Sequence, residues 1–270
     1  MSNSVRFAAR RRNVLGIKHL DAFAGGPRSA MQDFLIFLAR KDVIYHEHDF
    51  LANALDTTYW TTNTGTGGTA MASPGTKGLG GTIAGATGTD GTAGNRVVNM
   101  YGDLVWKGDN YCGMEVRLQV GAAATNIEWG LGFIDTHSTL TTPVVLVGDI
   151  DDASGLATSM ADAALMYQDT AQTLTTTALV TVGSTPYTAA STTVTPVFAP
   201  TAAVYFTVRL QLDGDNAYLA VEDANGSYCE TSKVGAIEGG TLVRPFFMIS
   251  GPTNTTKTWT IDRFALWQMR

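Results

Sequence analysis

The amino-acid sequence predicts an all-β protein, an antiparallel β-sandwich preceded by an extended basic N-terminal arm with one short helix. Three observations support this: a change of charge sign after the arm, strand patterns bounded by turn signals, and almost no helical periodicity after residue 42. Strands that follow one another through turns, without intervening helices, are typical of antiparallel sandwiches. We therefore divide the chain into an arm at 1–42 and a sandwich domain at 43–270.

The arm is distinguished by its charge. Residues 1–41 hold eight basic and two acidic side chains, a net charge of +6, whereas the rest holds 10 basic and 22 acidic side chains, a net charge of −12. A basic segment ahead of an acidic body predicts a protein that docks by its N-terminus and presents its body outward. The basic side chains assigned to docking are Arg6, Arg10, Arg11, Arg12 and Lys18.

A short helix is predicted over residues 29–41 of the arm. Met31, Phe34, Leu35 and Leu38 recur at i, i+3, i+4 and i+7, and Ser29 is a suitable N-cap. A helix of this length is marginal alone and requires a partner surface. The arginines alone fit the phosphates of a nucleic acid, the carboxylates of a protein surface or a solvated tail. The apolar stripe favours a protein surface, and nucleic acid is therefore not the expected partner.

The body contains two compositionally biased stretches and several strand patterns. Residues 61–94 are mostly Thr, Gly and Ala and are expected to be either mobile or held extended by neighbours, whereas 170–208 carries no charge and has apolar residues suited to β pairing. Strands are predicted at 111–120, 126–135, 203–212, 217–222, 242–250 and 258–268. The Asp213-Gly214 step predicts a hairpin turn.

Hydropathy and cysteine content also limit the cellular compartment in which the protein is expected. No apolar run approaches the length of a membrane span, and the N-terminus lacks the apolar core of a secretory signal, although an Arg-rich transit peptide remains an alternative. Cys112 and Cys229 are too few for a disulfide framework, so we expect buried free thiols and synthesis in a cytoplasm.

Candidate metal ligands are few. His46 and His48 would share one face of a strand, but no third ligand follows at useful spacing, and a polar strand edge explains them. The acidic stretches at 149–152 and 213–216 are candidate calcium loops, but their spacing does not match an EF-hand and ordinary turns explain them. No metal and no cofactor are predicted.

No catalytic motif is present either. Glu115 and Glu128 lie on neighbouring predicted strands and would be the candidate pair for glycoside hydrolysis, but an E-x-D-x-x-E cluster, a G-x-S-x-G elbow and an H-E-x-x-H motif are all missing. We predict that the protein is not an enzyme. Trp129 and Trp267 are expected in the core, and Trp106 is the tryptophan expected to be exposed and able to stack on a sugar.

Several segments together resemble one protein family. They are HDFLANALDTTYW (48–60), YCGMEVRLQV (111–120), NIEWGLGFIDT (126–136), YFTVRLQLDGDNAYLAVEDANG (205–226) and TWTIDRFALWQMR (258–270). In this order, over about residues 46–270, they resemble the concanavalin-like, lectin-like jelly-roll domains of structural proteins of tailed bacteriophages. The resemblance implies a bead of two β-sheets that decorates the head or forms part of a tail or fibre. The arm is not part of the shared pattern.

The expected function follows from the arm and the resemblance together. We expect a virion structural protein on the capsid surface, a decoration (cement) protein whose arm clamps the major capsid protein and whose body packs as a homotrimer. The alternative is a carbohydrate-binding module of a tail fibre or head fibre that contacts a host-surface glycan. A secreted lectin-fold hydrolase is a third reading, which a carboxylate pair in a cleft would support. No membrane partner is expected.

Overall fold

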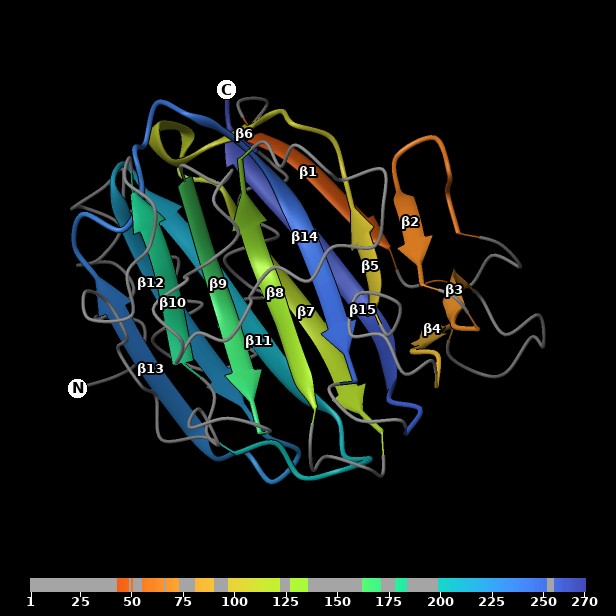
Figure 1. Cartoon of the computed structure of the whole chain (residues 1–270). Helices are drawn as coiled ribbons and strands as arrows, with labels where there is room; N and C mark the ends of the chain where they lie inside the picture. The colour runs from red at the N-terminus through yellow and green to blue at the C-terminus, as the bar shows by residue number, and fades with distance from the viewer. Residues whose placement is uncertain are drawn as a thin grey trace.

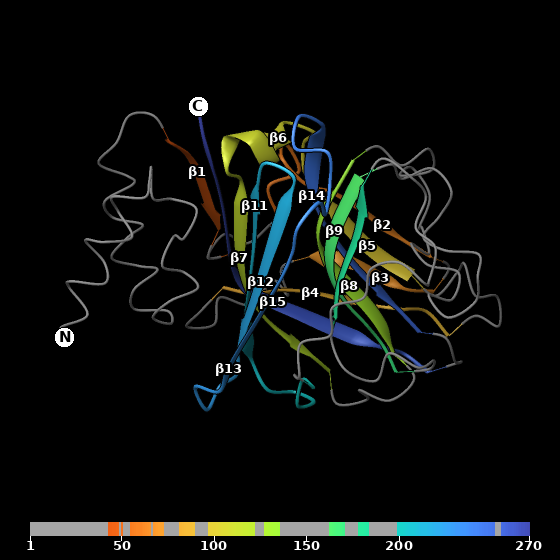
Figure 2. The same ribbon diagram turned by 90° about the vertical axis from the view of Figure 1, so that its left-hand side faces the viewer.

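The protein body is a sandwich of two antiparallel β-sheets, as Figures 1 and 2 show. This computed structural model describes residues 43–48, 50, 55–65, 67–72, 81–89, 97–121, 127–135, 162–170, 178–183, 199–251 and 255–270. The predicted all-β, lectin-like jelly-roll class is confirmed. Within the described ranges, no helix has the length and apolar character needed to span a bilayer.

The first sheet has eight strands in the order β13-β12-β11-β7-β15-β4-β3, and β1 pairs with the second half of β15. Its strands are β1 (Val43–His48), β3 (Thr69–Ala72), β4 (Ile83–Ala86), β7 (Gly113–Val120), β11 (Phe206–Asp213), β12 (Asn216–Glu222), β13 (Tyr228–Lys233) and β15 (Thr258–Met269). The predicted hairpin is confirmed, because β11 and β12 pair across the turn that contains Gly214 in a left-handed conformation, with a φ of 56°.

The second sheet has seven strands in the order β10-β9-β8-β14-β5-β2, and the short β6 pairs with β14. Its strands are β2 (Thr61–Thr64), β5 (Val97–Tyr101), β6 (Trp106–Lys107), β8 (Glu128–Ile134), β9 (Asp162–Asp169), β10 (Ala178–Gly183) and β14 (Leu242–Ser250). A 3₁₀ turn, η4 (Gly108–Asn110), follows β6. The described part of the Thr- and Gly-rich stretch forms β2, β3 and β4, so it is held extended by neighbouring strands.

The core lies between the sheets and follows the alternation in the sequence. On β7 the inward side chains are Met114, Val116, Leu118 and Val120, all buried, as the pattern predicts. Aromatic rings from both sheets meet at the centre: the ring centroids of Trp60 and Phe264 are 4.7 Å apart, and those of Trp129 and Trp259 are 5.6 Å apart. Offset and edge-to-face contacts of this kind add to the energy of burial.

The first described residue, Val43, opens β1 and lies opposite Met269 of β15. The side chains of Glu47 and Arg263 join the two strands through an ion pair of 2.7 Å. The arm at 1–42, its predicted helix and the predicted docking residues lie outside the described residues. Those residues are Arg6, Arg10, Arg11, Arg12, Lys18, Met31, Phe34, Leu35 and Leu38.

Candidate functional site

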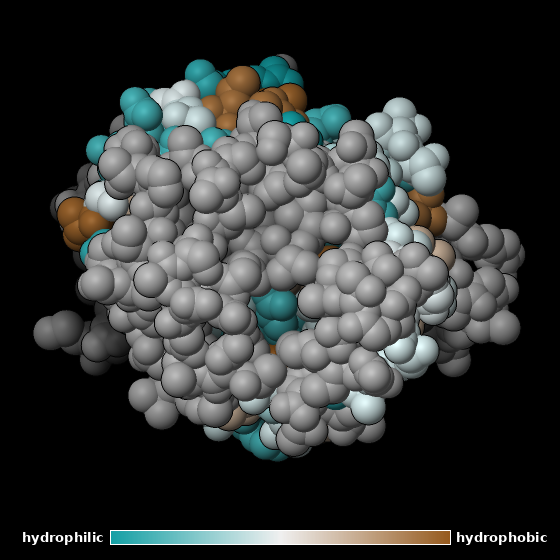
Figure 3. Space-filling model, in the orientation of Figure 1, coloured by the Kyte–Doolittle hydropathy of each residue, from teal (hydrophilic) through white to brown (hydrophobic). Residues whose placement is uncertain are grey.

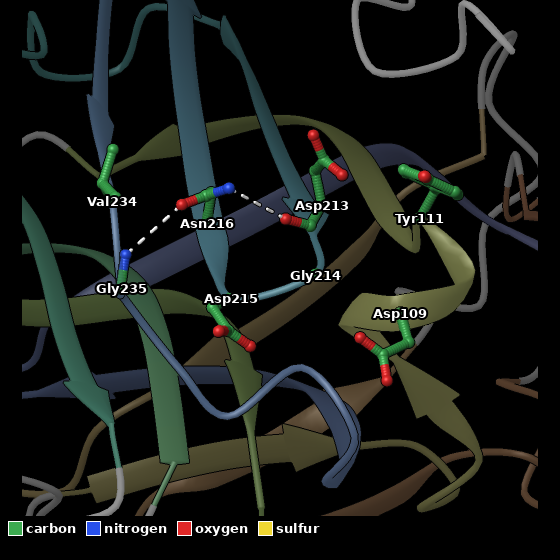
Figure 4. Close-up of a pocket in the computed structure, with 8 residues that line it drawn as sticks. All are labelled: Asp109, Tyr111, Asp213, Gly214, Asp215, Asn216, Val234 and Gly235. Atoms are coloured by element: carbon green, nitrogen blue, oxygen red, sulfur yellow. Dashed lines mark hydrogen bonds between the residues drawn. The ribbon is translucent and has the colours of Figure 1, made fainter.

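A polar pocket of about 480 Å³ lies where three loops meet at one end of the sandwich. The loops are η4, the β11–β12 turn and the turn that follows β13. The residues that line the pocket are Asp109, Tyr111, Asp213, Gly214, Asp215, Asn216, Val234 and Gly235. Figure 4 shows the carboxylates of Asp109 and Asp215 on opposite sides of the space between η4 and the β11–β12 turn.

Backbone hydrogen bonds hold η4 against its neighbours. The amide of Asp109 donates to the carbonyl of Gly239 at 3.0 Å, and the amide of Gly214 donates to the carbonyl of Gly108 at 2.9 Å. These approaches need glycine, because a Cβ added at Gly108 would collide with the carbonyl oxygen of Gly214. Gly108 and Gly239, where an added Cβ would collide with Gly214, are therefore the local sequence features that make the pocket possible.

Asp215 has a structural role as well as a place in the pocket. One of its carboxylate oxygens accepts a hydrogen bond from the amide of Gly239 at 2.9 Å, and its carbonyl accepts one from the amide of Ala236 at 2.6 Å. The side chain of Asn216 bridges the carbonyl of Asp213 and the amide of Gly235, as Figure 4 shows. These bonds tie the β11–β12 turn to the chain that follows β13.

The chemistry of the pocket is that of a hydrogen-bond acceptor. Three carboxylates line it, and no lysine or arginine is among the lining residues. Such a lining receives hydroxyl, ammonium or guanidinium donors and repels anions. Across the part of the chain that the structure describes, no group of three or more His, Cys, Asp or Glu side chains is arranged to hold a metal ion. Residues 149–152 lie outside that part.

His46 and His48 do share a face of β1, as predicted, but that face is turned to the core. Their ring centroids are 4.9 Å apart, and both rings pack against Phe264. Burial, with His48 close by, lowers the pKa of His46 below its usual value. The pair is thus part of an aromatic cluster that also includes Tyr59 and Phe50.

The expectation that Glu115 and Glu128 lie on neighbouring strands is wrong. Glu115 is on β7 in the eight-stranded sheet, where it contacts Arg209 at 2.7 Å. Glu128 is on β8 in the seven-stranded sheet, where it accepts a hydrogen bond from the hydroxyl of Tyr167 at 2.9 Å. Successive strands enter different sheets, so these two carboxylates do not form the pair that glycoside hydrolysis requires.

The expectation that Trp106 is exposed is also wrong. Its side chain is 2% exposed, and its indole nitrogen donates to the hydroxyl of Tyr59 at 3.2 Å. Trp129 is in the main core, as expected, whereas Trp267 packs with Ala265 and Tyr111 in a small separate cluster. Cys112 is buried, and burial raises the pKa of its thiol; Cys229 is half-buried.

Of the three loops that form the pocket, only the β11–β12 turn carries a clear signal in the sequence. Asp213, Asp215 and Asn216 are typical turn residues, whereas no pattern distinguishes Asp109 or Tyr111 as a site residue. Tyr111 carries a left-handed backbone, with a φ of 51°, at the end of η4. Nothing in the local sequence shows that 109 and 239 lie side by side.

Comparison with solved structures supports the fold. A protein of unknown function from Shewanella oneidensis MR-1 has a TM-score of 0.58 at 10% identity, and the match covers 91% of this chain and 95% of that one. Peanut lectin, solved with a 9mer peptide, has a TM-score of 0.55 at 11% identity, with 84% and 98% covered. The acidic lectin of winged bean, complexed with methyl-α-D-galactose, has a TM-score of 0.53 at 8% identity, with 84% and 99% covered.

No protein-family model matches the sequence, and no curated protein sequence does. The similarity to the lectins is therefore a similarity of fold. It identifies the body as a lectin-like β-sandwich, an architecture that places loops from both sheets at the ends of the molecule.

Proposed function

We propose that this protein is a structural protein of a tailed-phage virion, specifically a decoration protein on the capsid surface. The arm binds the major capsid protein through its basic side chains and the apolar stripe of its helix. The lectin-like body is carried on the outside. The proposal rests on one observation above all: a segment with a net charge of +6 is joined to a body with a net charge of −12.

The geometry of the junction supports this division. β1 continues directly from the arm and is secured along β15 by strand pairing from Val43 to His48. The ion pair between Glu47 and Arg263 adds a second link. A pull on the arm is thus transmitted to the longest strand of the sheet, which suits an anchored body.

A non-catalytic role is supported by how the acidic side chains are used. Glu115 and Glu222 both contact Arg209, at 2.7 and 3.6 Å. Glu128 is bonded to Tyr167 within the other sheet. Glu115 and Glu128 are held by structural partners on separate sheets, so these two carboxylates have no common space in which to act on a substrate.

The proposed mechanism is linkage. A protein that binds the assembled lattice and not free capsid subunits stabilises the lattice by mass action. Many copies, each with a modest contact, act together through multivalency. We expect a homotrimer at a symmetry axis, made in the host cytoplasm and incorporated into the virion after capsid expansion.

The test is cosedimentation with expanded capsids of the cognate phage assembled without this protein. Full-length protein should bind saturably, and a variant with Arg10→Glu, Arg11→Glu and Arg12→Glu should lose most of that binding. A matched variant with Arg117→Glu, Lys233→Glu and Arg270→Glu changes the same amount of charge on the body, at side chains that are not buried. Equal binding by the two variants would contradict the assignment to the arm.

Glycan binding by the pocket is the second candidate, and the pocket itself favours it. Its carboxylates accept hydrogen bonds from hydroxyl groups, and Tyr111 offers an aromatic ring beside them. The winged bean lectin of the same fold is complexed with a neutral sugar. Because the pocket repels anions, neutral or amino sugars are the ligands to expect.

A glycan array followed by calorimetry tests this candidate. Binding of a neutral or amino sugar should weaken at least tenfold in Asp109→Asn, because a charge-assisted hydrogen bond contributes about 1.5–3 kcal/mol. Glu230→Gln is the control, since Glu230 is on exposed β13 and not in the pocket. Binding that is unchanged in Asp109→Asn would rule the pocket out.

A further inference from the structure

The end of the sandwich where the arm begins carries most of the exposed apolar side chains. In the described part of the chain, five large hydrophobic side chains are exposed: Ile44 (39%), Val105 (50%), Tyr228 (39%), Val234 (82%) and Leu242 (41%). All but Tyr228 are at the end that bears β6, η4 and the start of β1. Figure 3 shows hydrophobic surface at this end, at the top of the view.

Contacts between neighbouring segments link Ile44, Val105 and Leu242. Ile44 lies opposite Gln268 in the pairing of β1 with β15. The side chain of Gln268 donates to the carbonyl of Val105 at 3.2 Å and accepts from the amide of Lys107 at 3.2 Å. Lys107 in turn lies opposite Leu242 in the pairing of β6 with β14.

The acidic pocket adjoins these apolar residues. Asp109 follows Lys107 by two residues, and its amide bonds to Gly239, three residues before Leu242. Val234, the most exposed of the five, is part of the pocket lining. Three carboxylates and four exposed apolar side chains therefore belong to one end of the body, which we call the arm-side end.

We propose that the arm-side end is a second docking surface, for a protein that inserts a lysine or arginine into the Asp109–Asp215 pocket and covers Val105 and Leu242 with apolar side chains. The inference rests on the proposed function, under which the partner is the major capsid protein. The arm joins the body at Val43, the first residue of β1, which lies at this end. Under this proposal the arm and the body bind the same partner.

Charge and apolar area together favour a protein over a glycan as occupant. Carboxylates without a basic lining residue fit a cationic side chain, whose charge-assisted bonds are stronger than those of a neutral hydroxyl. Exposed apolar side chains gathered at one place mark protein contact surfaces. A sugar in the pocket would leave Val105 and Leu242 uncovered.

The test is the same cosedimentation assay, with full-length point variants. Val105→Glu combined with Leu242→Glu should weaken capsid binding at least tenfold, and Asp109→Lys should do the same by reversing the charge of the pocket. Tyr228→Glu is the matched control, because Tyr228 is equally exposed but is on the edge strand β13 and not at the arm-side end. Each variant is first compared with the wild type by thermal unfolding, and Val105→Ser with Leu242→Ser replaces the glutamates if those unfold early.

The outcomes separate this inference from the proposed function. Wild-type affinity in the Val105/Leu242 and Asp109 variants, with loss of binding in the arginine variant, would overturn the second surface and leave the arm as anchor. Absence of wild-type binding would overturn both. A third outcome is that the Asp109→Lys variant still binds capsids but no longer binds a neutral sugar that the wild type binds. This outcome would assign the pocket to a glycan and overturn the inference.

Discussion

Arg209 and Glu115 form an ion pair of 2.7 Å on adjacent strands of the eight-stranded sheet, and the Arg209 side chain is 2% exposed. Glu222 lies 3.6 Å from the same guanidinium on the other side. A charge this deeply buried is stabilised by its partners and becomes costly when one of them is removed. The effect of substituting this pair on stability therefore measures how strongly these charges hold β7, β11 and β12 together.

We predict that Glu115→Ala lowers the free energy of unfolding by about 3 kcal/mol, the lower end of the range for breaking a buried pair, because Glu222 still compensates Arg209. The triple variant Glu115→Leu, Arg209→Met and Glu222→Gln should lose less than Glu115→Ala alone, since it removes all three charges of this cluster together. Urea unfolding of the wild type and the two variants measures both values. A larger loss in the triple variant would show that packing, and not the charge, is what Glu115 supports.

Stability should depend on pH through His46. Its pKa is lowered in the folded protein by burial, so the unfolded state binds the proton more readily. The full contribution is present above the unfolded pKa of about 6.5 and is lost as pH falls from there to the folded pKa. In the described part of the chain, Nε2 of His46 has no hydrogen-bond partner, so a proton there would have no acceptor.

The measurement is urea unfolding at several pH values between 8 and 5. The wild type should lose stability toward pH 5, and His46→Gln should lose less over the same interval. If the free energy of unfolding changes equally with pH in the two proteins, groups other than His46 are responsible for the pH dependence.

Gly108→Ala should open the pocket. The added Cβ collides with the carbonyl oxygen of Gly214, so η4 and the β11–β12 turn must separate, at a cost of about 1–3 kcal/mol for overpacking. Gly240→Ala is the matched control from the same region, because its Cβ would be 3.6 Å from the nearest atom, an oxygen of Asp109. In thermal unfolding, Gly108→Ala should have a lower midpoint temperature than Gly240→Ala. Equal stability would show that η4 moves without cost.

All five tryptophans should be shielded from solvent. Trp60, Trp106, Trp129 and Trp259 are at most 2% exposed and Trp267 is 9% exposed. We expect a blue-shifted emission maximum and weak quenching by acrylamide, with both changing together on unfolding. Strong quenching of the native protein would contradict the burial of Trp106 in particular. Ligand binding at the pocket should be followed by calorimetry, since no tryptophan lines it.

Much of the secondary structure was predictable because its signals are local. The alternation in β7, the apolar face of β8 and the Asp-Gly turn between β11 and β12 each depend on residues within one strand or turn. The Thr- and Gly-rich stretch was not decided by its own composition. Its described segments are extended because β5 and β15 supply the pairing partners of β2 and β4.

By itself, the sequence determined the all-β class, the inward faces of the strands and the charge boundary between arm and body. Only the tertiary structure decided that β7 and β8 enter different sheets, which separates Glu115 from Glu128, and that Trp106 is covered by Tyr59. The tertiary structure also decided the pocket, because the pocket depends on contacts of residue 239 with residues 109 and 215. The physical reason is that strand pairing and layer packing depend on contacts between segments far apart in the chain. Such contacts produce no recognisable pattern in the sequence of any single segment.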